Sequence, residues 1–127
     1  MKLRHAAVAL IALSVCSVAH AEMSVSTFLA KADALKAKGM MAMLSSDVGL
    51  LKTEMQTAVQ SFKADDALAK QAGKPSVACV PAKTKLDSEE IIGFFRTIPA
   101  PQAPRISVKT GLSAMLAKRY PCPGKVH

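Results

Sequence analysis

Apolar residues recur at three- and four-residue steps in four segments of the chain, which is the spacing of one face of an α-helix. The predicted helices lie between residues 24 and 39, 46 and 73, 87 and 98, and 107 and 121. Residues 40–44 are predicted to form either a single helical turn or a connector. No segment alternates apolar and polar residues for long enough to indicate a strand. The pattern therefore predicts an all-α bundle of four main helices with a short fifth.

Residues that start and stop helices flank these segments. Asp87 and Glu90 form a capping box, and Ser107 is placed to cap the last helix. The caps predicted for the first two helices are Ser24 or Ser26, and Ser46 or Asp47, respectively. Between the last two helices, three prolines within residues 99–104 predict a stiff, extended connector.

The first 21 residues have the pattern of a cleaved secretory signal peptide. A basic segment, residues 1–5, precedes a largely apolar segment, residues 6–18. Ala19-His20-Ala21 is a typical cleavage site. A segment of 13 residues is too short to span a bilayer, which needs about 20 apolar residues. Lipidation of Cys16 is the alternative, although Val15 stands where a small residue is expected. We expect a single periplasmic domain, residues 22–127, without stable membrane insertion.

Two cysteines, Cys79 and Cys122, remain after the predicted cleavage. An even number of cysteines in an oxidising compartment favours a disulfide. That bond would close a loop of about 44 residues and stabilise the fold by roughly 4 kcal/mol in the chain-entropy model. The expected domain is therefore a disulfide-stapled bundle.

Basic residues outnumber acidic ones, with a net charge of +8 for the whole chain. Loss of Lys2 and Arg4 leaves 15 basic and 9 acidic residues, a charge of +6. The lysines are scattered, and the single tyrosine, Tyr120, offers no series of stacking aromatics, so nucleic-acid binding is not expected. Two explanations of the charge stay open, namely a solvated cationic face and attraction to an acidic partner.

Side chains that carry catalysis are scarce. The histidines are His5, His20 and His127, so the interior of the mature domain lacks the commonest general base and the ligands of an ordinary zinc site. Lys109-Thr110-Gly111 matches a motif of serine penicillin-binding enzymes, but the accompanying Ser-x-x-Lys is missing. We expect a protein that is not an enzyme and has no cofactor.

Three methionines, Met40, Met41 and Met43, cluster between the first two predicted helices. Thioethers bind Cu(I), which suggests copper handling. The alternative is that the methionines fill gaps in the core. No histidine or cysteine lies nearby to complete a copper site, so core packing is the prediction.

The proline-containing connector is the predicted contact surface for a partner, because a rigid loop presents side chains with little ordering cost. Arg96 and Arg105, which flank the connector, are suited to carboxylate recognition. The alternative is that the prolines only join two helices. The candidate partner-binding residues are Arg96, Pro99, Pro101, Gln102, Pro104 and Arg105.

Residues 79–122 carry four motifs in order: Cys79-Val80-Pro81, Leu86-Asp87-Ser88-Glu89-Glu90-Ile91-Ile92 at a helix start, Pro99, and Tyr120-Pro121-Cys122. This order resembles the Rap/Tai family of small, all-helical periplasmic immunity proteins of type VI secretion systems. The resemblance covers about a third of the chain, and residues 22–76 lack the further cysteines and the Gly-Tyr motif that the family often carries. It implies that Cys79 and Cys122 are joined, and that the protein binds and blocks a cell-wall amidase effector as a homodimer.

Two functions are consistent with these features of the sequence. The first is a non-catalytic, immunity-type inhibitor that occludes the active site of a peptidoglycan amidase effector. The alternative is a periplasmic chaperone or envelope-stress helper with exposed methionine and leucine side chains.

Overall fold

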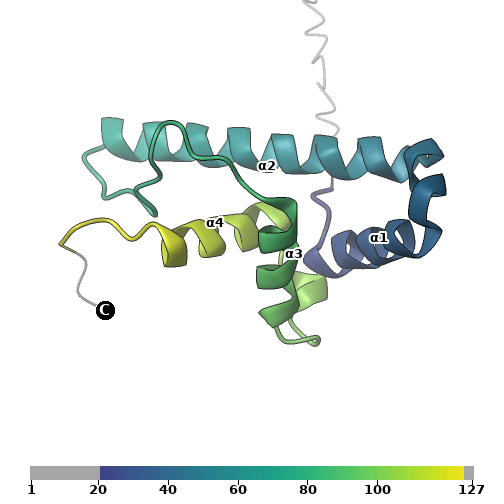
Figure 1. The fold of residues 1–127 in the computed structure, drawn as a ribbon. Coiled ribbons are helices and arrows are strands. Elements are labelled where there is room, and N and C mark those ends of the chain that lie inside the picture. The colour runs from purple at the N-terminus through teal and green to yellow at the C-terminus, as the bar shows by residue number, and fades with distance from the viewer. Residues whose placement is uncertain (1–20, 125–127) are drawn as a thin grey trace, which may run out of the picture.

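The computed structural model describes residues 21–124 and confirms the predicted all-α fold (Figure 1). The predicted signal peptide lies outside the described residues except for Ala21. Within the described part, the only extended pairing is an isolated bridge between Ser24 and Ser107, and no helix is both long and apolar enough to cross a bilayer. The elements are α1 Val25–Lys38, the 3-10 helix η1 Gly39–Leu44, α2 Ser46–Gln71, α3 Ser88–Thr97, the 3-10 helix η2 Ala103–Arg105, and α4 Val108–Arg119.

Helix α2 is the longest of the described elements, with 26 residues and a length of about 39 Å. Helices α1 and α4 begin close together near its middle and run toward its opposite ends, while α3 crosses at a steep angle (Figure 1). The two starts are joined by backbone hydrogen bonds, from Val25 N to Ile106 O (2.8 Å) and from Val108 N to Met23 O (2.9 Å). These bonds satisfy N–H groups at the helix starts that have no partner within their own helix.

Polar side chains cap all four α-helices, because the first backbone N–H groups of a helix lack intrahelical acceptors. Ser24, Asp87 and Ser107 act as predicted. The cap of α2 is Ser45, one residue before the predicted candidates, because the backbone of Ser45 is still extended whereas Ser46 is already helical. Glu90 of the predicted capping box pairs instead with Arg119 of α4.

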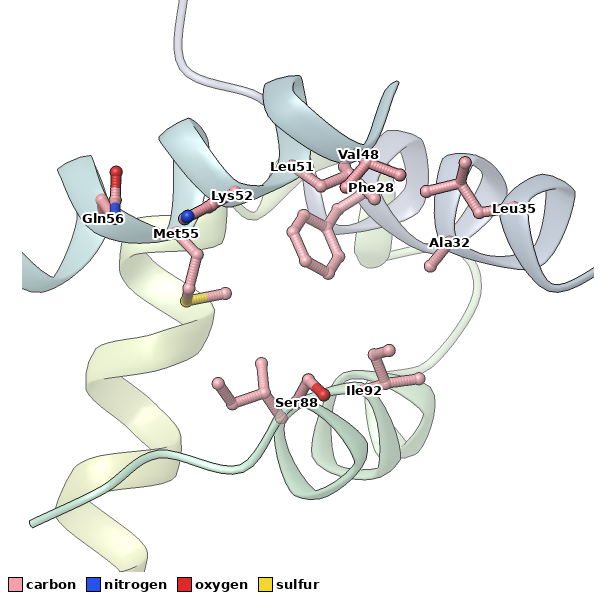
Figure 2. Close-up of a pocket in the computed structure, with 11 residues that line it drawn as sticks. Phe28, Ala32, Leu35, Val48, Leu51, Lys52, Met55, Gln56, Ser88 and Ile92 are labelled. Carbon is pink, nitrogen blue, oxygen red and sulfur yellow. The ribbon is translucent and has the colours of Figure 1, made fainter. Parts of the chain in front are cut away.

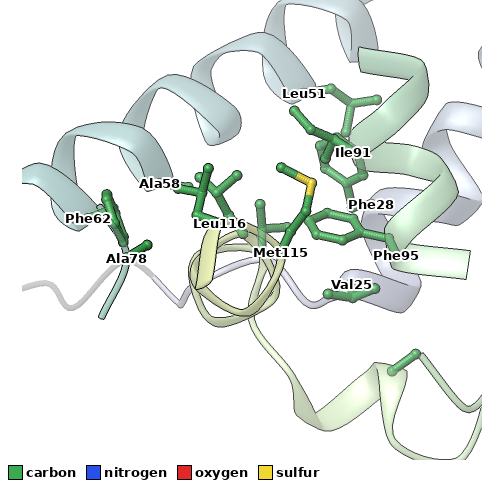
Figure 3. Close-up of a cluster of buried hydrophobic side chains, with 13 residues drawn as sticks. Val25, Phe28, Leu51, Ala58, Phe62, Ala78, Ile91, Phe95, Met115 and Leu116 are labelled. Atoms are coloured by element: carbon green, nitrogen blue, oxygen red, sulfur yellow. The ribbon is translucent and has the colours of Figure 1, made fainter. Parts of the chain in front are cut away.

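The core lies where α2 and α4 face α1 and α3 (Figure 3). Phe95, Leu112, Val25 and Val108 are completely buried. Phe28 and Phe95 pack edge to face, with ring centroids 5.6 Å apart, an arrangement that aromatic rings favour. The inward-facing residues of the predicted helix stripes therefore meet in one continuous core.

The predicted link between Cys79 and Cys122 is present in the structure as a disulfide, with a Cα–Cα distance of 4.9 Å. It ties the loop after α2 to the residues after α4. Beside it, the backbone N–H of Cys79 donates to the carbonyl of Tyr120 (2.8 Å). The two cysteines are therefore held together by backbone pairing as well as by their covalent bond.

The connector between α3 and α4 is not extended, so that prediction is wrong. Gln102 N donates to Pro99 O (2.8 Å) and Arg105 N donates to Gln102 O (2.8 Å), which makes a turn followed by η2. The fixed φ of proline suits the first positions of such turns as well as extended chain. Burial of Ala103 in the core draws the segment into the compact form.

Candidate functional site

The apolar side chains of η1 point into solvent. Exposed fractions are 94% for Met40, 64% for Met41, 82% for Met43 and 80% for Leu44, and we call these four residues the methionine tip. The prediction that the methionines fill core gaps is therefore wrong. They lie at the outer end of the α1–α2 hairpin, at the right of Figure 1, where no other described element lies beyond them.

Local interactions hold the methionine tip in place. Gly39 ends α1 with a φ of 54°, a conformation that glycine adopts without strain. On the other side of the tip, Ser45 caps α2. Lys31 Nζ and Asp47 Oδ1 are 2.9 Å apart and join the two helices beneath the tip. The hydrogen bond from Lys31 lowers the pKa of Asp47, whose carboxylate therefore stays charged over a wider pH range.

An apolar cleft of about 500 Å³ adjoins the tip (Figure 2). It lies between α1, α2 and α3, and Phe28 and Met55 point into it. Val48, in the first turn of α2, lines the cleft and follows the tip closely in the chain. The tip and the cleft are therefore neighbouring apolar features of one hairpin.

The charged groups around these features leave an excess of positive charge. Lys36, Lys38 and Lys52 form no ion pair with any carboxylate in residues 21–124. The nearby carboxylates of Asp33 and Asp47 are already paired, with Arg96 and Lys31 respectively. An acidic surface would therefore complement this side of the molecule.

The six predicted partner-binding residues lie at or beside the turn between α3 and α4, and all are exposed. Arg96 is tied to α1 through Asp33, with 2.5 Å between Nη2 and Oδ1. The turn packs near the start of α1, whereas the methionine tip follows its end. The 14 residues of α1 separate the two surfaces by about 21 Å.

Two further ion pairs involve neighbouring carboxylates of α2. Asp66 pairs with Lys70 (2.7 Å), and hydrogen bonds from Lys70 and Ser76 lower its pKa. Asp65 pairs with Lys109 (2.8 Å) and raises the pKa of that lysine through the hydrogen bond between them. Lys109 of the Lys-Thr-Gly motif is therefore engaged in a structural ion pair with Asp65.

No group of three or more histidine, cysteine, aspartate or glutamate residues in the described part of the chain could hold a metal ion.

The core-packing interpretation of Met40, Met41 and Met43 missed the exposure of the methionine tip, although the chaperone alternative assumed exposed methionine and leucine side chains. The cleft beside the tip was not predicted. A run of five residues bounded by Gly39 and a serine cap is short enough to be a surface turn between two helices, and that signal pointed to exposure. The cleft depends on how three helices diverge and has no local signal. No protein-family model, curated protein or solved structure matches this chain.

Proposed function

We propose that the protein is an exported, non-catalytic binding protein that docks on a partner protein through its methionine tip. In its specific form, the proposal is an immunity-type inhibitor that blocks a peptidoglycan amidase effector of a type VI secretion system. The observation that carries it is the tip itself, in which four of five successive residues are large, apolar and 64% to 94% exposed.

An exposed apolar group of this kind favours association. Covering one methionine or leucine side chain contributes roughly 1.5–3 kcal/mol, so the tip supplies about 6–12 kcal/mol. Association itself costs roughly 4–15 kcal/mol in lost freedom of motion. Tight binding therefore needs further contacts. Lys36 and Lys38 lie beside the tip, form no ion pair within residues 21–124, and would supply these contacts to an acidic surface.

The shape of the tip favours insertion into a concave partner. It protrudes from the end of a helical hairpin, and the flexible methionine side chains adapt to an irregular cavity. The active-site cleft of a hydrolase is such a cavity. The motif order over residues 79–122, which resembles the Rap/Tai family, supports an amidase as the partner, and the disulfide suits an oxidising compartment such as the periplasm.

The direct test uses the mature chain and a cell-wall amidase effector encoded next to it. We expect a stable complex and inhibition of peptidoglycan hydrolysis at stoichiometric amounts. The double variant Met41→Glu/Leu44→Glu should lose both. Leu68→Glu is a matched control, because Leu68 is equally apolar and 63% exposed but lies far along α2. Inhibition that survives in the tip variant would exclude the tip as the inhibitory element.

The methionine tip also favours the alternative of a periplasmic chaperone or envelope-stress helper. Methionine-rich surfaces repack around unrelated partners and so permit broad specificity. In that case the mature chain would suppress aggregation of several unrelated denatured proteins, and Met41→Glu/Leu44→Glu would abolish the effect. Absence of suppression together with inhibition of one amidase would leave only the first function.

A further inference from the structure

The cleft between α1, α2 and α3 has the dimensions and lining of a small-molecule site. Its volume of about 500 Å³ falls within the range of roughly 300–1,000 Å³ that is typical of ligand pockets. Phe28, Leu51 and Ile91 are buried side chains that form its inner wall. Ala32, Leu35 and Ile92 continue the apolar lining outward on α1 and α3 (Figure 2).

Polar groups of the lining are few and come from two places. Lys52 and Gln56 are one helical turn apart on α2, and Ser88 is the first residue of α3 (Figure 2). Lys52 is exposed and pairs with no carboxylate in residues 21–124. A single unpaired ammonium beside an apolar cleft would pair with an anionic group at one end of an otherwise apolar molecule.

We propose that this cleft binds an anionic amphiphile with an aliphatic chain, with the chain against Phe28 and Ile91 and the anionic head at Lys52. The aliphatic chain matches a lining that offers hydrogen-bonding groups only at Lys52, Gln56 and Ser88. The net positive charge of the protein attracts such anions. The cleft adjoins the methionine tip, but neither proposal depends on the other.

The test titrates the mature chain with decanoate below its micellar concentration and, separately, with uncharged 1-decanol, by isothermal titration calorimetry. We expect saturable one-to-one binding of both. Ala32→Phe fills the cleft and should weaken both ligands by about tenfold or more, because it removes the space that the chain needs. Ala34→Phe, on the exposed side of the same helix, should change neither.

Lys52→Gln tests the head group without filling the cleft. It should weaken decanoate about three- to fivefold, the range of a partly exposed ion pair, and leave 1-decanol within twofold. Lys83→Gln is the matched control, because Lys83 is exposed in a loop outside the cleft. This surface substitution keeps the test decisive if Ala32→Phe fails to fold.

Three results would overturn the proposal. The first is that neither decanoate nor 1-decanol binds. The second is that folded Ala32→Phe binds both with undiminished affinity, and the third is that Lys52→Gln changes the affinity for both ligands equally. A second copy of the chain could also occupy the cleft. Sedimentation would then show a dimer that Ala32→Phe dissociates and that decanoate leaves intact, and this result too would overturn the proposal.

Discussion

Gly111 of α4 lies directly against the ring of Phe95 in α3. A Cβ atom at position 111 would come within 2.9 Å of Phe95 Cε1 and 3.0 Å of Val25 Cγ2. Phe95 and Val25 are completely buried, so either side chain could move aside only by displacing packed neighbours. The absence of a side chain at Gly111 therefore sets how closely α4 approaches α1 and α3.

This contact predicts that Gly111→Ala is destabilising, although alanine is the better helix former. Overpacking costs about 1–3 kcal/mol and outweighs the gain in helix propensity of at most about 1 kcal/mol. Gly93→Ala is the matched control, because position 93 is helical with open space around it, and it should stabilise by about 0.5–1 kcal/mol. Urea unfolding measures both. A stabilised Gly111→Ala protein would refute the close approach.

The disulfide predicts that substitution of either cysteine lowers the free energy of unfolding by the same amount. Cys79→Ser and Cys122→Ser should each lower the free energy of unfolding by about 4 kcal/mol, because each frees the same loop in the unfolded chain. The double variant should be no less stable than either single one. Urea unfolding of the three variants, with the reduced wild type beside them, makes the comparison. Additive losses would show that the cysteines are not partners.

The two depressed carboxyl pKa values predict a loss of stability in acid. The pKa values of Asp47 and Asp66 lie below the ordinary 3.8, because Lys31 and Lys70 respectively donate hydrogen bonds to the charged forms. Their stabilising effect is therefore complete above the unfolded pKa near 3.8 and is lost as the pH falls through the folded pKa values.

Unfolding free energies at pH 6, 4 and 3 measure this effect. Asp47→Asn and Asp66→Asn should be less stable than the wild type at pH 6, and the difference should shrink by pH 3. A difference that stays constant over this range would mean that neither carboxylate contributes through its charge.

We expect the turn between α3 and α4 to contribute less than the methionine tip to binding of the proposed amidase partner. A standard interface covers about 800 Å² on each partner, a patch roughly 30 Å across, which is wide enough to include both surfaces. Arg105→Glu should reduce the association rate and its salt dependence, as expected for a charge at the rim. Surface plasmon resonance at two salt concentrations separates this effect from the faster dissociation expected of Met41→Glu.

Local signals in the sequence determine most of the fold. The helix stripes placed Phe28, Leu51, Phe95 and Leu112 inward, and all four are buried. The caps Ser24, Asp87 and Ser107 act on backbone N–H groups two or three residues away, so their effect is readable from the chain itself. The disulfide needed only the count of cysteines and the expectation of export.

The candidate site was less predictable because it depends on how the helices are arranged in space. Hydrophobicity predicted burial of Met41, but a turn at the end of a hairpin is covered only if another element passes over it. The ion pairs of Lys31 with Asp47 and of Arg96 with Asp33 join different helices, and no spacing rule along one helix anticipates them. The turn at residues 99–105 depends on the burial of Ala103, which is likewise a tertiary effect.

The bridge between Ser24 and Ser107 bears on when this protein can fold. The N–H of Val25 at the start of α1 donates to Ile106, and Met23 accepts from Val108, so the first helix is completed by residues near the opposite end of the chain. Contacts between such distant residues form slowly. The start of α1 therefore cannot be completed in a growing chain until residues 106–108 have been synthesised.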